Sequence, residues 1–225
     1  MNKKVHNFSA GPSILPDKVF EQASSAIKDF NNSGLSILEI SHRSKDFIEV
    51  LEEARFTALD IAELNKDEYT CLYLQGGASL QFLMTAYNFL NNNAAYINTG
   101  SWSTKAIKEA KMFGDVTEIA SSADKNFNYI PKDLSLNESY DYLHLTSNNT
   151  IFGTQFHSFP DVNYPLFADM SSDIFSRKIN FSKFDLIYAG AQKNLGPAGV
   201  TMVLIRKSLL KNITRQVPSM LSYKI

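Results

Sequence analysis

The segment Thr70–Asn98, TCLYLQGGASLQFLMTAYNFLNNNAAYIN, carries the pattern that decides the fold. Its apolar run at 70–74 has the length of a buried strand, and the run at 95–98 is strand-like as well. Between them, residues 79–90 place apolar side chains along a length that is typical of a helix. A strand, a helix and a second strand in this order predict an α/β domain with parallel neighbouring strands.

The same alternation extends in both directions along the chain. Toward the carboxyl end we predict helices at 103–112 and 208–213 and strands at 116–119, 142–146, 166–168, 186–189 and 201–205. Toward the amino end, the segment from Pro16 to Phe30 has apolar residues at helical spacing, and a second helical pattern follows Arg43 and ends near Ile61. The predicted fold class is α/β, with a mostly parallel sheet flanked by helices.

The composition is that of an ordinary globular domain. Of 225 residues, 44% are hydrophobic and 20% are charged, and 22 Lys and Arg nearly balance 23 Asp and Glu, for a net charge of -1. Binding to nucleic acid or to an anionic membrane is therefore not expected. The first residues lack the apolar stretch of a signal peptide and no run could span a membrane, so a cytoplasmic location is expected. The single cysteine, Cys71, lies in an apolar run and is interpreted as a buried structural thiol.

Polar or glycine-rich residues follow five of the predicted strands. In an open parallel sheet the ligand site lies beyond the carboxyl ends of the strands, so these segments are expected to gather at one edge. They are Gln75–Ser79, Asn98–Trp102, Ser147–Thr150, Asp169–Ser172 and Gly190–Asn194. The first opens directly into a helix whose unpaired N–H groups can bind a phosphate, although a tight turn without a ligand has the same signature. The motifs G-x-G-x-x-G and G-x-x-x-x-G-K-[ST] are absent, which disfavours a Rossmann dehydrogenase.

Three side chains in these segments suggest a specific chemistry. Asp169 ends a predicted strand, where it could pair with a protonated pyridine nitrogen or, more commonly, form a turn. Lys193 follows another strand, where it could form a Schiff base or simply be solvated. Trp102 could stack on a heteroaromatic ring or pack in the core. The residues alone leave these alternatives open.

A family resemblance distinguishes between them. The segment Tyr188–Gly199, YAGAQKNLGPAG, resembles the lysine segment of the phosphoserine aminotransferases, and the likeness continues in order through Asn7–Pro12, Glu39–Ser44, Gln75–Ser79 and Ala168–Ser172. The resemblance implies a pyridoxal-phosphate (PLP) enzyme of fold type I in the class V aminotransferase family, with an α/β/α large domain. It also implies amino transfer between glutamate and a phosphorylated 2-oxo acid, 3-phosphohydroxypyruvate, in serine and pyridoxine biosynthesis. Such enzymes are cytoplasmic homodimers with shared active sites.

The resemblance also implies roles for individual residues. Lys193 would carry the cofactor as a Schiff base and move the substrate proton, and Asp169 would bind the pyridine nitrogen. Trp102 would stack on the ring, and Thr150 would contact its hydroxyl side. The remaining matches are Ala78, Ser79 and Gln192 for the cofactor phosphate, and His42 and Arg43 for a substrate anion. No metal is expected.

Two departures from the family pattern affect the expected activity. The first departure concerns Ser79 and Leu80, since some relatives have an arginine in this glycine turn that helps to bind the substrate phosphate, whereas others have Ala-Ser as here. Family members also continue well past Ile225, so we expect residues 1–225 to form the large PLP-binding domain with an amino-terminal arm, without the small carboxy-terminal domain. Two alternatives stay open: an inactive cofactor-binding or dimerising domain, and another reaction on the same cofactor, such as that of a lyase or a desulfurase. The lack of a cysteine in an exposed loop disfavours the desulfurase.

Overall fold

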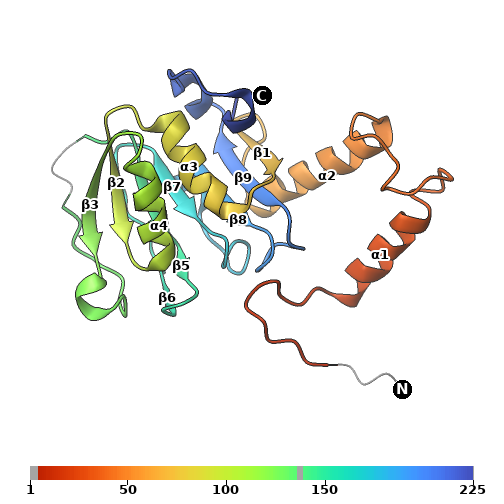
Figure 1. Cartoon of the computed structure of the whole chain (residues 1–225), viewed down its shortest axis with the longest axis horizontal. Helices are drawn as coiled ribbons and strands as arrows, with labels where there is room; N and C mark the ends of the chain where they lie inside the picture. Colours follow the sequence, from red (N-terminus) through yellow and green to blue (C-terminus); the bar gives the residue numbers. More distant parts are fainter. Residues whose placement is uncertain (1–4, 136–138, 225) are drawn as a thin grey trace.

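The computed structural model describes residues 5–135 and 139–224. Within these residues, seven strands form one sheet in the order β1-β9-β8-β7-β4-β2-β3 (Figure 1). They are β1 (Tyr69–Leu74), β2 (Asn93–Asn98), β3 (Asp115–Ser121), β4 (Leu143–Thr146), β7 (Leu166–Asp169), β8 (Leu186–Gly190) and β9 (Thr201–Arg206). A small hairpin of β5 (Asn148–Asn149) and β6 (Thr154–Gln155) follows β4.

The directions of the strands bring the carboxyl ends of most strands to one edge of the sheet. Strands β3, β2, β4, β7 and β8 are mutually parallel, whereas β9 is antiparallel to both of its neighbours, β8 and β1. Strand β1 therefore runs in the same direction as β8. The mostly parallel sheet is confirmed, and the loops that follow β1, β2, β4, β7 and β8 all emerge at one edge, as predicted. Every residue of β4, β7 and β8 is buried, as is typical of strands covered on both faces.

Two helices cover the face of the sheet that is in front in Figure 1: α3 (Gly77–Phe89) and α4 (Ser101–Ala110). Their apolar side chains, among them Phe82, Phe89 and Ile107, pack on Phe167 and Tyr188 of the sheet. The chain end folds onto the same core through the short turns η3 (Leu209–Asn212) and η4 (Ser219–Leu221). This packing fixes α3 and α4 with their amino termini at the edge where the loops gather.

The opposite face is covered less regularly. Helix α2 (Lys45–Ile61) begins at Ser44, whose hydroxyl accepts a hydrogen bond from the Phe47 N–H, and it packs its carboxyl-terminal part on the sheet. The connections on either side of β7, residues 156–165 and 170–184, complete this layer. The connection from β7 to β8 contains only turns and the short η2 (Phe181–Lys183), since Ser, Asp and Asn in this stretch favour turns.

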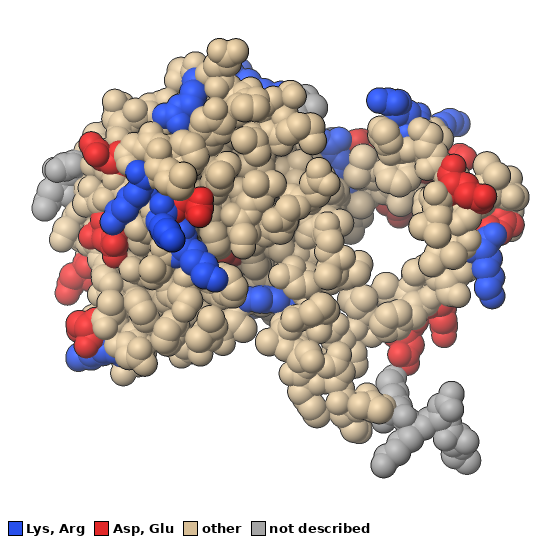
Figure 2. All heavy atoms as spheres, in the orientation of Figure 1, with Lys and Arg blue, Asp and Glu red and all other residues tan. Residues whose placement is uncertain are grey.

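The amino-terminal part of the chain stands apart from the sheet. Helix α1 (Asp17–Lys28) has no buried residue, and its apolar side chains Phe20 and Ile27 are exposed. Figure 2 shows an opening between this arm and the rest of the molecule. The amphipathic helix predicted here is confirmed, but its apolar side covers no core within the described residues.

One predicted helix is wrong. The segment 208–213 forms the single 3-10 turn η3, because six residues supply too few hydrogen bonds to offset the cost of starting an α-helix. A further short turn, η1 (Ala123–Lys125), follows β3. Among the described residues, no helix combines the length and the apolar composition needed to cross a membrane.

Candidate active site

A pocket of about 130 Å³ lies at the edge where the strand ends gather. All five predicted loop segments contribute residues to its lining, and the segment Asn98–Trp102 does so through Trp102 in the first turn of α4. The lining residues are Gly77, Ala78, Ser79, Phe82, Trp102, Thr146, Asn148, Asp169, Ser171, Ser172, Gln192 and Lys193. The structure thus brings Ala78, Ser79, Trp102, Asp169, Gln192 and Lys193 together around one cavity.

Lys193 lies on the loop that joins β8 to β9. Its Nζ is 2.6 Å from Thr150 Oγ1, and it lies 5.4 Å from the centroid of the Trp102 ring. The side chain is half-buried, and this burial lowers the pKa of the amine, whereas the nearby Asp169 opposes the shift. A lowered pKa increases the fraction of neutral amine, which is the form that attacks a carbonyl group.

Asp169 is the last residue of β7 and is almost fully buried. Its Oδ1 accepts hydrogen bonds from the Ser171 N–H at 2.9 Å and from the Ser171 hydroxyl at 2.6 Å. Burial raises the pKa of this carboxyl group, while the bonds from Ser171 and the charge of Lys193 oppose that rise. Ser171 Oγ also accepts from the Gly190 N–H at 3.0 Å, so the carboxyl group is fixed to β8.

The amino terminus of α3 forms one wall of the pocket. Gly76 precedes the helix with φ of 92°, and a Cβ at this residue would lie 2.8 Å from Leu80 Cβ, so only glycine fits. The first turn, which includes Ala78 and Ser79, has N–H groups without partners inside the helix. These groups and the helix dipole favour a bound phosphate at this wall.

Trp102 also lines the pocket. The Nζ of Lys105, one turn later on α4, lies 4.6 Å from the centroid of the indole ring. Basic side chains gather over α4 in Figure 2. Two buried polar atoms of pocket residues, Trp102 Nε1 and Thr146 Oγ1, have no hydrogen-bond partner among the described residues. Unpaired polar groups of this kind are typical of a site that binds a polar ligand.

Three of the predicted site residues, His42, Arg43 and Thr150, do not line the pocket. His42 and Arg43 are exposed and lie just before α2, whose amino-terminal end points toward α1 and away from the sheet (Figure 1). Neither residue lines the pocket. Their predicted role in binding a substrate anion therefore stays a prediction. Thr150 is also absent from the lining, although its hydroxyl contacts Lys193.

Sequence reasoning gave no role to several residues that the structure brings to the site. Thr146 pairs with Asp169 in the register of β4 and β7, and Asn148, Ser171 and Ser172 line the pocket. Each lies at the end of a strand or in a loop that follows one, which is the signal that could have found it. Phe82, one turn into α3, carries no such signal.

The amino-terminal arm also reaches the lysine loop. The Ser13 N–H donates to Gln192 O at 2.9 Å, and the Ser13 hydroxyl donates to Lys193 O. A Cβ at Gly11 would lie 3.1 Å from Lys193 Cγ, so the arm packs closely against the lysine side chain. Ser13, 180 positions before Lys193, thus holds the backbone on both sides of the Lys193 side chain.

Other sites within the described residues lack comparable chemistry. A cavity of about 300 Å³ next to Phe156 and another of about 510 Å³ next to Met220 are larger, but neither combines an amine with a buried carboxyl group. No group of three His, Cys, Asp or Glu in the described part of the chain could hold a metal ion. Cys71 is buried in β1, and burial raises the pKa of its thiol to about 11, which confirms its interpretation as a buried thiol.

An amine, a buried carboxyl group, an indole and a helix amino terminus surround one pocket at the strand ends. These groups fit the pieces of PLP: an aldehyde, a pyridine nitrogen, a flat ring and a phosphate. Fold and site together define a fold-type-I transferase. The model of the family described as aminotransferase class-V matches residues 5–220, and the chain belongs to this family.

Phosphoserine aminotransferases are among the most similar known proteins. That of Flavobacterium psychrophilum is 59% identical over 223 residues, which are 98% of this chain and 63% of the relative. The structure of phosphoserine aminotransferase from Bacillus circulans subsp. alkalophilus has a TM-score of 0.92 at 46% identity and covers 96% of this chain and 61% of its own. The structure of PLP-bound phosphoserine aminotransferase from Trichomonas vaginalis has a TM-score of 0.90 at 35% identity. This match covers 98% of this chain and 63% of that chain. The chain thus spans less than two thirds of the length of these relatives.

Proposed function

We propose that this chain is the cofactor-binding part of a phosphoserine aminotransferase, which holds PLP on Lys193 and exchanges an amino group between glutamate and 3-phosphohydroxypyruvate. The observation that carries the proposal is that Lys193 and Asp169 line one pocket beside the amino terminus of α3. The similarity to phosphoserine aminotransferases along 98% of the chain supports this choice of substrate. A cytoplasmic role in serine and pyridoxine biosynthesis belongs to the same proposal.

The chain's own residues account for binding and orientation of the cofactor. The free N–H groups at Ala78 and Ser79, together with Gln192, would hold the phosphate. Trp102 would cover one face of the ring. Thr150, which contacts Lys193 Nζ, would lie at the hydroxyl side of the ring. Held by these residues, the ring would have Asp169 as the partner of its nitrogen and Lys193 as the partner of its aldehyde carbon.

The catalytic roles follow from the protonation of two groups. When bound, PLP supplies an electron-withdrawing ring that stabilises negative charge at the substrate α-carbon, provided that its nitrogen is protonated. The carboxylate of Asp169 would accept the hydrogen bond from that nitrogen, and Ser171 stabilises the ionised carboxylate through two hydrogen bonds. Lys193 would take the proton from the substrate α-carbon as a general base, and its lowered pKa increases the fraction of neutral amine that is available for this step.

The proposed site for the substrate anion involves residues of a partner subunit. His42 and Arg43 are exposed, and the adjoining helices α1 and α2 expose Phe20, Ile27 and Ile48. Exposed apolar surface of this kind is typical of a protein interface. In a homodimer, His42 and Arg43 would reach the neighbouring pocket, where the fork of Arg43 suits a carboxylate or phosphate. Glutamate and the phosphorylated 2-oxo acid are thus proposed to bind between subunits.

The test of the proposal is the chemistry of Lys193. The chain mixed with PLP should gain an absorbance band that borohydride removes, and the mass of one reduced cofactor should be found on the peptide that contains Lys193. Lys193→Ala should abolish both signals, whereas Lys178→Ala, an exposed lysine paired with Glu63, should leave them unchanged. Attachment at another lysine would overturn the proposal.

Half-reactions separate the proposed activity from the alternatives. The PLP-loaded protein should lose its absorbance band with glutamate and regain it with 3-phosphohydroxypyruvate. A response to cysteine but not to glutamate would favour a lyase or a desulfurase. Bound PLP with no response to either amino acid would favour an inactive cofactor-binding domain.

A further inference from the structure

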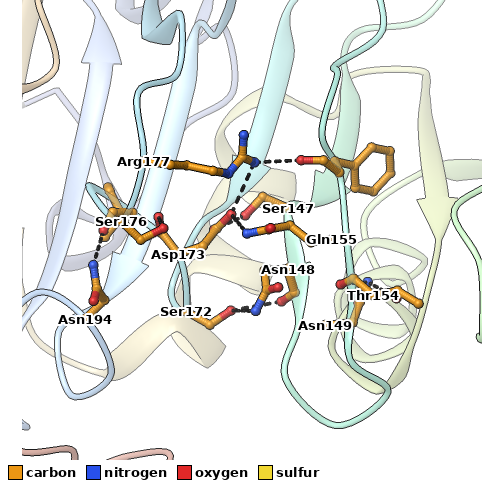
Figure 3. A network of polar contacts seen from close by, with 12 residues as sticks. Ser147, Asn148, Asn149, Thr154, Gln155, Ser172, Asp173, Ser176, Arg177 and Asn194 are labelled. Carbon is orange, nitrogen blue, oxygen red and sulfur yellow. Dashed lines mark hydrogen bonds and ion pairs between the residues drawn. The ribbon is translucent and has the colours of Figure 1, made fainter.

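The buried carboxyl group of Asp173 joins several segments that carry site residues (Figure 3). Asp173 is only 3% exposed, and its two oxygens have three partners. The Ser147 hydroxyl donates to Oδ1, Gln155 Nε2 donates to Oδ2 at 3.0 Å, and Arg177 Nη2 lies 3.5 Å from Oδ2. A buried carboxylate is stable only with such partners, so these side chains are tied to one place.

Two of the partners are the two ends of the β5–β6 hairpin. Ser147 lies just before β5, and Gln155 ends β6. The Phe156 N–H donates to Ser147 O at 2.8 Å, and Arg177 Nη2 donates to Phe156 O at 2.6 Å, so the base of the hairpin is closed around Asp173. The turn of this hairpin begins with Thr150, the residue whose hydroxyl lies 2.6 Å from Lys193 Nζ.

The segment around Asp173 also holds the loop that carries Lys193 and the carboxyl group of Asp169. Asn194 Nδ2, on the residue after Lys193, donates to Ile174 O at 2.5 Å. Asn148 and Ser172 exchange two hydrogen bonds of 2.9 Å. Ser171, two residues before Asp173, donates to Asp169. One short segment thus anchors each loop that brings a reactive group into the pocket.

We propose that Asp173 is a positioning residue of the cofactor site, which fixes Thr150 opposite the amine of Lys193. It acts through the base of the β5–β6 hairpin and touches neither the pocket nor the amine. The inference rests on the proposed capture of PLP by Lys193. Losing the ionic partner of Ser147, Gln155 and Arg177 would leave the hairpin free to shift, and Thr150 would move away from the amine.

The experiment compares Asp173→Asn with a matched control. An amide at residue 173 can donate its NH2 group to the Ser147 hydroxyl and keep its oxygen toward Gln155, but it carries no negative charge for Arg177, so the ionic contact is lost. The control is Asp185→Asn, since Asp185 accepts from Arg206 Nε at 3.0 Å and from the Leu166 N–H at 3.1 Å, at the edge of the sheet opposite to the pocket. Asp173→Asn should weaken PLP capture about tenfold, the change that corresponds to one lost charged hydrogen bond. Asp185→Asn should lower the unfolding temperature without changing capture.

A second substitution tests the mechanism of the effect. When Asp173→Asn is combined with Gln155→Glu, the amide at residue 173 can donate to the new carboxylate, which can also pair with Arg177. This double variant should regain most of the lost capture and the wild-type pH dependence of the cofactor absorbance. If Asp173→Asn does not fold, Gln155→Met removes one donor without unpairing the carboxylate and should reduce capture in the same direction.

The outcomes distinguish the inference from the proposed function. Equal capture by wild type, Asp173→Asn and Asp185→Asn would overturn the inference, and so would a defect that the double variant does not rescue. No capture by the wild type would instead overturn the proposed function. In that case, the contact of Thr150 with Lys193 can be measured in the cofactor-free chain through the pH dependence of reductive methylation at Lys193. If this pH dependence were the same in Asp173→Asn and in the wild type, the inference would be overturned.

Discussion

The amine nitrogen of Lys193 lies 2.6 Å from the hydroxyl oxygen of Thr150, although 43 residues separate them in the sequence. Lys193 comes from the loop between β8 and β9, whereas Thr150 comes from the turn of the β5–β6 hairpin. The contact therefore links two loops that leave the same edge of the sheet. A hydroxyl oxygen accepts a stronger hydrogen bond from an ammonium than from a neutral amine, so Thr150 favours the charged form of Lys193.

Replacing the hydroxyl should therefore change the titration of Lys193. In Thr150→Val, we expect the pKa of Lys193 to fall further below its usual value, because burial then acts with one opposing contact fewer. The midpoint of the pH dependence of reductive methylation at Lys193 should move to lower pH. Thr117→Val is the control, since Thr117 pairs with Asn93 at the far edge of the sheet. A midpoint that moves to higher pH would contradict the assigned direction.

Asp169→Asn should have opposite effects on stability and on cofactor capture. Burial raises the pKa of Asp169 in the folded chain above that in the unfolded chain, about 4, so the folded state binds this proton more tightly. Its contribution to stability is fully present below pH 4 and is lost as pH rises through the folded pKa. The asparagine keeps an acceptor for Ser171 but carries no charge.

The cofactor-free variant should thus be more stable than the wild type at pH 7, with the difference vanishing toward pH 4. Urea unfolding at several pH values measures this difference. At the same time, capture of PLP should fall, because the partner of the pyridine nitrogen is lost. A stability difference that is independent of pH would show that burial of the charge is not its cause.

Gly76→Ala tests the turn that leads into α3. Its φ of 92° strains any other residue, and the new Cβ would also press on Leu80. Gly34→Ala is the matched control, because Gly34 has φ of 74° and no atom near the position of its Cβ. We expect about 1 kcal/mol of lost stability at Gly34 and clearly more at Gly76 in urea unfolding. Only Gly76→Ala should weaken the binding of PLP, since only it displaces the helix amino terminus.

The sequence pattern predicted most of the sheet but less of what connects its strands. Strand and helix positions follow from apolar periodicity, and the gathering of Trp102, Asp169 and Lys193 follows from the rule for parallel sheets. The antiparallel direction of β9 and the turns between β7 and β8 were not predicted, because direction and crossover type depend on packing between distant segments. The contacts of Ser13 with the lysine loop also join distant segments, and no local pattern marks them.

The roles of individual site residues could be predicted only through the family motif. Lys193 alone has the same local sequence environment as a solvated lysine, and its lowered pKa arises from burial that only the folded chain shows. The role proposed for Asp173 had no sequence signal, since its partners Ser147 and Gln155 are ordinary polar residues 26 and 18 positions away. Buried polar networks are therefore the part of the site that needs the structure.

The exposed position of Arg43 permits a test of the shared site. If Arg43 serves the pocket of the neighbouring subunit, Lys193→Ala and Arg43→Ala subunits should complement one another. A mixed dimer then has one pocket with both defects and one with none. Each variant alone should be nearly inactive in amino transfer, while an equal mixture, dissociated and reassembled at random, should regain roughly a quarter of the wild-type activity. If Arg43 served its own pocket, every pocket in the mixture would carry one defect, and the mixture would stay as inactive as its parts.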